Sequence, residues 1–173
     1  MKRVRVDNVE NSLQPAAVMR PLTEALGLTD LAVNYYELEP GDSFAFAYHS
    51  HEVQEEAFYV ISGTATFETD DGPVEVGKNE IVRFDREEFQ RGWNRGDEPV
   101  RALALGAPLE YGEMPRLRYC PDCDAEADTE FDRVTEAGED DKASSREAVI
   151  ARCVECGAET GRWYRGSMDG EVP

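Results

Sequence analysis

Short runs in which apolar and polar residues alternate fill the chain from residue 32 to residue 106. The runs are rich in β-branched and aromatic residues, and turn residues such as Pro40-Gly41 separate them. Alternation with period two predicts half-buried β-strands. About eight short strands at close spacing are typical of an antiparallel sandwich or barrel with little helix. The runs read "LAVNYYEL", "SFAFAYHSH", "EAFYVISG", "TATFET", "PVEVG", "NEIVRF", "FQRGWN" and "VRALALG".

The residues before the first predicted strand have a different pattern. The stretch "PLTEALGL" predicts one short helix, with Thr23 as its cap and Gly27 as its stop. We therefore expect residues 1–31 to form an N-terminal segment that packs on a β-barrel made by residues 32–115.

The composition changes near Pro115, and residues 116–173 hold too few apolar side chains for an independent core. A unit this small needs a cross-link or a metal to fold. Strands are predicted at "EFDRVTE", "EAVIARC" and "TGRWYRG", with the acidic "EAGEDDKASS" as a solvated loop between the first two. The chain is thus expected to contain a second, small β domain over residues 116–173.

All four cysteines lie in this second unit, in two C-x-x-C pairs: Cys120-Pro-Asp-Cys123, and Cys153-Val-Glu-Cys156 followed by Gly157. These pairs resemble the two knuckles of a zinc ribbon, in which a short turn lets two thiolates reach one ion. The resemblance implies a closed, structural zinc site with four thiolate ligands. Two disulfides or a reactive dithiol are the alternatives, but neither explains how so small and acidic a unit folds.

Acidic residues dominate the charge, because 37 Asp and Glu against 18 Lys and Arg give a formal net charge of -19. Halophilic proteins use such high surface charge, so a salt-adapted protein is expected. The charge disfavours nucleic acid and anionic membranes as partners, since Lys and Arg bind both. The N-terminus lacks the apolar stretch of a signal peptide, and no run is long enough to span a membrane. We therefore expect a cytoplasmic protein.

The only two histidines, His49 and His51, stand two residues apart in a predicted strand. Side chains two apart on a strand share one face, so both imidazoles are expected to project together. After a short turn, Glu56 begins the next predicted strand and brings a carboxylate close to the same point. Two imidazoles and one carboxylate with open positions are the donor set used for Fe(II), and it also suits Mn, Zn, Ni or Cu.

The spacing of these residues resembles the first motif of the cupin superfamily, H-x-H-x(3,4)-E-x(6)-G, which ends here at Gly63. The resemblance implies a double-stranded β-helix, or jelly-roll, barrel with a divalent metal such as Fe, Mn, Ni or Zn inside. The second motif, G-x(5)-P-x-G-x(2)-H-x(3)-N, is only partly met: Gly77 begins it and Asn94 ends it. The expected fold class is all-β, a cupin barrel followed by a small zinc-ribbon-like domain.

The third histidine of the cupin motif is missing, and counting back from Asn94 its position holds Gln90. A neutral amide is a poorer metal donor than imidazole, so weaker metal binding is expected. Glu88, counted forward from Gly77, is a rival candidate, and Gln90 can instead act from outside the ligand shell. The alternative for the two histidines is that they are hydrogen-bonded core residues with no metal.

Two functions of different classes follow from these observations. The first is a metal-dependent enzyme that acts on a small organic molecule, with the reaction (oxygenase, isomerase or lyase) unresolved because cupin barrels support many. The second is a non-catalytic protein that senses a metabolite or a metal, with the zinc-ribbon module contacting a partner protein. A purely structural role is a third, weaker possibility. Cupin barrels often pair through edge strands, so the resemblance also implies a homodimer.

Overall fold

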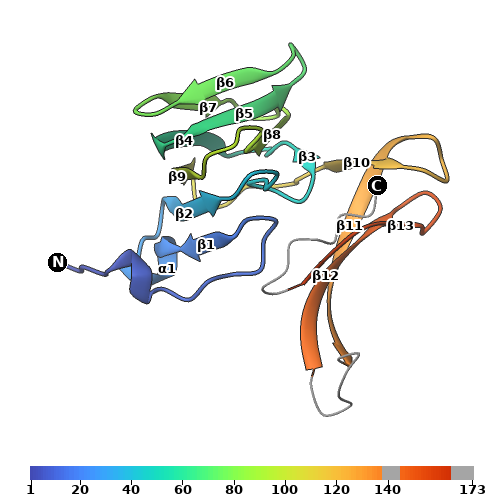
Figure 1. Ribbon diagram of the computed structural model, residues 1–173, viewed down its shortest axis with the longest axis horizontal. Coiled ribbons are helices and arrows are strands. Elements are labelled where there is room, and N and C mark those ends of the chain that lie inside the picture. The colour runs from blue at the N-terminus through green and yellow to red at the C-terminus, as the bar shows by residue number, and fades with distance from the viewer. Residues whose placement is uncertain (138–144, 165–173) are drawn as a thin grey trace. The chain divides into compact units, whose positions relative to one another are not determined.

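The computed structural model describes residues 1–137 and 145–164 of the chain (Figure 1). It divides into two compact units, Met1–Met114 and Pro115–Pro173, which are described separately. Most of the predicted acidic loop, together with the C-terminal residues, lies outside the described residues. Strands contain 51% of the residues and helices 5%, so the predicted all-β class is confirmed.

Two antiparallel sheets make up the first unit. The strand order is β1-β2-β9-β4-β7 in one sheet and β3-β8-β5-β6 in the other. A 3-10 turn at Val6–Asn8 and the short helix α1 at Leu22–Leu26 are its helical elements among the described residues. The strands are β1 (Val18–Pro21), β2 (Ala32–Leu38), β3 (Tyr48–His49), β4 (Glu55–Ser62), β5 (Thr64–Thr69), β6 (Val74–Gly77), β7 (Ile81–Phe84), β8 (Gln90–Trp93) and β9 (Val100–Ala107).

The N-terminal segment contributes a strand that the sequence pattern did not predict. β1 pairs antiparallel with β2, and Met19 lies opposite Tyr36. The predicted stop of the helix is correct, because Gly27 adopts the left-handed conformation at the C-cap of α1. Thr23 is not the cap. Its hydroxyl oxygen instead accepts a hydrogen bond from the Val33 amide at 2.7 Å, which ties α1 to β2.

A cluster of phenylalanines fills the space between the two sheets. Phe58 on β4 and Phe84 on β7 come from one sheet, and Phe67 on β5 comes from the other. Phe44 packs between them, with its ring centroid 5.0 Å from that of Phe58 and 5.6 Å from that of Phe67. Gly92 on β8 leaves the necessary room, since an added Cβ would lie 2.5 Å from the Phe67 ring. Burial of these rings stabilises this unit together with the aliphatic side chains of the same core.

The second unit is a four-strand antiparallel sheet in the order β10-β11-β12-β13, where the sequence predicted three strands. Trp163 is its largest buried side chain, and Arg118 lies over the Trp163 ring with its guanidinium carbon 4.9 Å from the ring centroid. The Arg118 guanidinium also donates hydrogen bonds to the Thr160 carbonyl oxygen. The strands are β10 (Arg116–Cys120), β11 (Ala125–Ala137), β12 (Ser145–Cys153) and β13 (Glu159–Tyr164).

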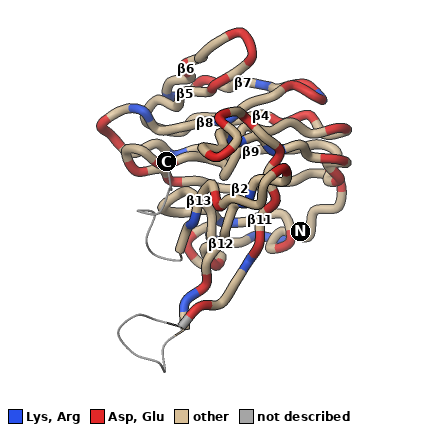
Figure 2. The backbone as a smooth tube through the Cα atoms, turned by 90° about the vertical axis from the view of Figure 1, so that its right-hand side faces the viewer, with Lys and Arg blue, Asp and Glu red and all other residues tan. Residues whose placement is uncertain are grey.

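Acidic side chains far outnumber basic ones along the backbone of the described residues (Figure 2). The part of the chain that the structure describes contains no helix that is both long and apolar enough to cross a membrane.

The left-handed glycine at the end of the first motif yields a test of the barrel packing. Gly63 has φ +77°, and an added Cβ would lie 2.7 Å from the Pro99 carbonyl oxygen. Gly72 has φ +104° but has no atom within 4 Å of an added Cβ. We expect Gly63→Ala to lower the free energy of unfolding by about 1–3 kcal/mol more than Gly72→Ala, because only Gly63 adds a backbone clash to the conformational strain. Urea denaturation of both variants measures the difference, and equal losses would contradict it.

Candidate metal centres

His49 and His51 lie next to each other, although not for the predicted reason. The predicted strand over residues 43–51 is strand only at Tyr48–His49, and His51 follows it outside any strand. The two rings are nevertheless 5.2 Å apart between centroids, and each histidine is 9% exposed. The loop after β3, and not the alternation of a strand, therefore brings the imidazoles together.

Glu56 reaches the two imidazoles from the start of β4. One ligand atom from each of His49, His51 and Glu56 can be chosen so that all three lie within 4.8 Å of one another. His51 Nε2 lies 3.7 Å from Glu56 Oε2. The Glu56 side chain is 17% exposed, and burial raises the pKa of its carboxyl to about 7, against a smaller lowering by the Gln90 amide.

Gln90 touches both kinds of predicted ligand. It lies opposite His49 in the pairing of β3 with β8. Its amide nitrogen donates a hydrogen bond to Glu56 Oε2 at 2.9 Å and lies 3.4 Å from His49 Nε2. Gln90 is 2% exposed, and its amide oxygen has no hydrogen-bond donor among the described residues. Glu88, the rival candidate, is exposed, and its carboxylate accepts a hydrogen bond from the Asp85 amide instead.

These residues fit a divalent ion. The Nδ1 atom of His49 lies 3.0 Å from the Ala47 carbonyl oxygen, which fits an Nδ1–H donor that leaves Nε2 with the lone pair that a metal needs. The largely buried Glu56 carboxylate and the buried Gln90 amide oxygen, for which the described residues offer no donor, stand beside it. The set of two imidazoles and one carboxylate matches the facial triad of non-haem iron sites. Gln90 lies within reach either of an ion or of its ligands.

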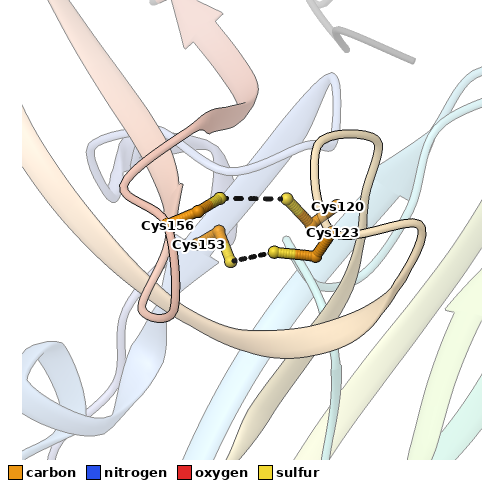
Figure 3. Close-up of side chains that lie close together, drawn as sticks. All are labelled: Cys120, Cys123, Cys153 and Cys156. Atoms are coloured by element: carbon orange, nitrogen blue, oxygen red, sulfur yellow. Dashed lines mark hydrogen bonds between the residues drawn. The ribbon is translucent and has the colours of Figure 1, made fainter.

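The four cysteines of the second unit converge on one point (Figure 3). The sulfur atoms of Cys120 and Cys156 are 3.5 Å apart, and those of Cys123 and Cys153 are 3.9 Å apart. Sulfurs at the corners of a tetrahedral zinc site, with Zn–S bonds of about 2.3 Å, lie roughly 3.8 Å from one another. A disulfide needs a separation of about 2.0 Å, so the two-disulfide alternative does not describe this arrangement.

The two turns that carry the cysteines have matching backbone conformations. Gly157, directly after the second C-x-x-C pair, has φ +77°, and Asp124, directly after the first, has φ +50°. The Gly157 amide donates to the Cys153 carbonyl oxygen at 2.9 Å. Backbone amides, first that of Cys156, lower the pKa of the Cys153 thiol to about 7. The second turn therefore stabilises the thiolate of Cys153, the form that binds zinc, whereas hydrogen bonding with the other thiols, first that of Cys156, raises the pKa of Cys123.

One residue beside the barrel site was missed by the sequence analysis. The Tyr111 ring meets the His51 ring edge-on, with centroids 5.9 Å apart. Tyr111 lies far along the chain and outside every predicted strand, so neither alternation nor motif spacing pointed to it.

The comparisons with known proteins agree with this fold. Residues 34–106 match the family model described as "Cupin domain". The polyketide cyclase RemF from Streptomyces resistomycificus is a similar solved structure, with 23% identity and a TM-score of 0.57 over 72% of this chain and 90% of that one. A sugar phosphate isomerase from a cupin superfamily, from Silicibacter pomeroyi, has 20% identity and a TM-score of 0.55 over 91% of both chains. A predicted oxalate decarboxylase from Thermotoga maritima has 22% identity and a TM-score of 0.53, over 62% of this chain and 99% of that one.

No curated protein matches the sequence. The match to the cupin model covers residues 34–106, and the solved structures share the fold that the histidine motif predicts. The fold is an all-β cupin fold, a double-stranded β-helix, with a cysteine cluster towards the C-terminus. His49, His51 and Glu56 are placed so that they could hold a metal in this fold.

The raised pKa of Glu56 predicts how stability depends on pH in metal-free protein. The folded state binds the Glu56 proton more tightly than the unfolded state, where the pKa is about 4.5. The contribution of Glu56 is therefore fully present below pH 4.5 and is lost as the pH rises through 7. We expect Glu56→Gln, which carries no charge, to raise the free energy of unfolding at pH 8 by up to about 3 kcal/mol and to change it little at pH 5.

Urea denaturation with chelator present, at both pH values, measures this effect. Glu55→Gln is the control, because Glu55 is the neighbouring residue and its side chain is half-exposed. An equal change at pH 5 and pH 8 for Glu56→Gln would show that the buried carboxyl is not the source.

Proposed function

We propose that this protein is a metal-dependent cupin that acts on a small organic molecule at a divalent ion held by His49, His51 and Glu56. The observation that carries the proposal is the convergence of these three donors around a largely buried carboxylate. A divalent ion there would supply Lewis-acid or redox activation of a bound substrate. Burial raises the pKa of Glu56 to about 7, so its charged form is unfavourable unless a cation lies beside it. A buried carboxyl of this kind supports a functional role for Glu56.

The protein's own groups have distinct roles in this proposal. The Ala47 carbonyl orients His49, and Gln90 holds Glu56 through its amide nitrogen. The similar structures are named as a cyclase, an isomerase and a predicted decarboxylase. Three reactions on one fold leave the reaction of this protein open, because the fold alone does not determine the chemistry.

Gln90 is also the observation that favours a second function, a non-catalytic protein that senses a metabolite or a metal. Its amide nitrogen lies within reach of both Glu56 and His49, so the donors have a partner in the absence of an ion. A site satisfied in this way suits weak and reversible metal binding. In this alternative the zinc-ribbon-like unit mediates the contact with a partner protein.

We infer that the cysteine cluster holds zinc and that this zinc is structural. Four thiolates complete a tetrahedral shell and leave no position for substrate. Among the described residues of the unit, the large buried apolar side chains are Trp163, Val149 and Ile150, a small core to which the ion would add folding free energy. A salt-adapted, cytoplasmic homodimer is the setting that we propose, with the net charge of -19 as support for the first of these properties.

Metal analysis of protein purified without added metal tests the first proposal. We expect two ions per chain, of which Cys123→Ser removes the zinc and His49→Ala removes the other. Each variant serves as the control for the other. If only the cysteine-dependent zinc appears, and Fe(II), Mn(II) and Ni(II) give no saturable binding, the metal-dependent function is wrong.

Substitution of Gln90 tests the weak-binding argument. Gln90→His introduces an imidazole at a buried position beside His49 and Glu56, and we expect it to tighten Ni(II) binding at least about tenfold, since imidazole is the better donor. Isothermal titration calorimetry measures the affinity. Glu88→His is the matched control, because Glu88 is exposed and points to the Asp85 amide, and it should leave the affinity unchanged. An effect of equal size in both variants would refute a specific role for position 90.

A further inference from the structure

Residues 108–113 form a strap that is fixed against the segment that carries His51. The Glu52 amide donates to the Glu113 carbonyl oxygen at 3.0 Å, and the Glu113 amide donates to the Glu52 carboxylate at 2.9 Å. The Gln54 amide nitrogen donates to the Pro108 carbonyl oxygen at 2.6 Å. Gly112 approaches so closely that an added Cβ would lie 2.5 Å from the Glu52 carboxylate. The strap is therefore a built part of the site edge, held from several points.

Three large apolar side chains stand exposed along this junction. Tyr111 is 47% exposed, and Val53 and Leu109 are each 36% exposed. The Val53 amide donates to the Tyr111 carbonyl oxygen at 3.3 Å, and the Gln54 side chain lies 3.4 Å from the Leu109 carbonyl oxygen, so the three belong to one locality. The Tyr111 ring also contacts the His51 ring. We call Val53, Leu109 and Tyr111 the apolar rim.

The charge around the apolar rim is predominantly negative. The segments that meet at His51 are residues 50–54, 85–89 and 107–114, and the Glu87 amide bonds to the His51 carbonyl oxygen at 2.8 Å. Within these segments Arg86 is the one basic residue, and the acidic residues are Glu52, Asp85, Glu87, Glu88, Glu110 and Glu113.

Arg83 on β7, two residues before Asp85, is already engaged. It forms ion pairs with Glu55 and Asp85 at 3.1 Å and 2.8 Å. An anionic group at the rim would therefore meet six acidic residues against the single guanidinium of Arg86, whereas recognition of phosphate or carboxylate relies on several such cations.

We propose that the apolar rim binds the apolar or aromatic part of a small ligand that is uncharged or cationic, and that the rim itself disfavours phosphate and carboxylate groups. The inference rests on the proposed function, because the rim ligand would be the substrate or effector of the barrel site. The side chains of the rim, and not the fold, define this ligand class. Exposed apolar side chains beside a polar site are the usual binding arrangement for such ligands.

Two fluorescent probes of similar aromatic structure separate the charge from the apolar contact. N-phenyl-1-naphthylamine is neutral, and 8-anilinonaphthalene-1-sulfonate carries a sulfonate. We expect the full-length protein to bind the neutral probe saturably and at least about tenfold more tightly than the anionic one. Tyr111→Ala should weaken binding of the neutral probe about tenfold, the loss expected for one aromatic contact. Tyr111→Phe should retain the binding, because it keeps the ring.

Two further variants make the result specific. Ile81→Ala removes an apolar side chain that is 62% exposed outside the rim, and it should leave binding unchanged. Glu110→Lys should strengthen binding of the anionic probe and leave the neutral probe nearly unaffected. Equal affinity for the two probes, or neutral-probe binding that survives Tyr111→Ala, would overturn the proposal.

The same titrations on His49→Ala distinguish this inference from the proposed function. Because the rim does not include His49, probe binding should persist in that variant even when its barrel metal is lost. Loss of metal binding with intact, Tyr111-dependent probe binding would refute the metal-dependent function alone. Intact metal binding with no preference for the neutral probe would refute the rim inference alone.

Discussion

The aromatic packing between the two sheets is the constraint on which the barrel site depends. On β4, Phe58 follows Glu56 by two residues, and on β8, Gly92 follows Gln90 by two residues, so each polar side chain shares a strand face with a core position. Phe84 lies directly opposite Glu56 in the pairing of β4 with β7. Packing of the phenylalanines therefore sets where the carboxylate and the amide lie, and the site is a polar layer next to an apolar one.

The two candidate metal centres make opposite physical demands on the chain. The barrel has a large apolar core that needs no ion. Burial of Glu56 beside this core makes its charged form unfavourable, which raises its pKa. The second unit has a small apolar core around Cys120 and Cys153, and for it the ion would be part of the fold. Loss of metal should thus affect chemistry in one unit and folding in the other, which is why the two sites are separable by experiment.

The strong negative charge has a local meaning in addition to its effect on solubility. It surrounds the segments that meet at His51 with carboxylates, while the neighbouring Arg83 is neutralised by Glu55 and Asp85. A sugar phosphate isomerase has a similar fold, but in our proposal the edge of this protein is poorly suited to phosphate. We propose that these side chains at the edge determine the ligand class, because the fold alone does not.

Local patterns in the sequence were sufficient for most strands of the barrel, the C-cap at Gly27 and the two cysteine turns, because each is determined by neighbours close in the chain. They missed β1 and predicted too long a strand before His51. The convergence of His49, His51 and Glu56 was predicted from the motif. The predicted explanation, that both histidines share one face of a strand, was wrong because His51 lies outside the strand. The contact of Gln90 with both Glu56 and His49, the pairing of β1 with β2, and Tyr111 beside His51 were decided only by the tertiary structure. Each joins residues that are distant in sequence, and no short-range pattern encodes which distant segments meet.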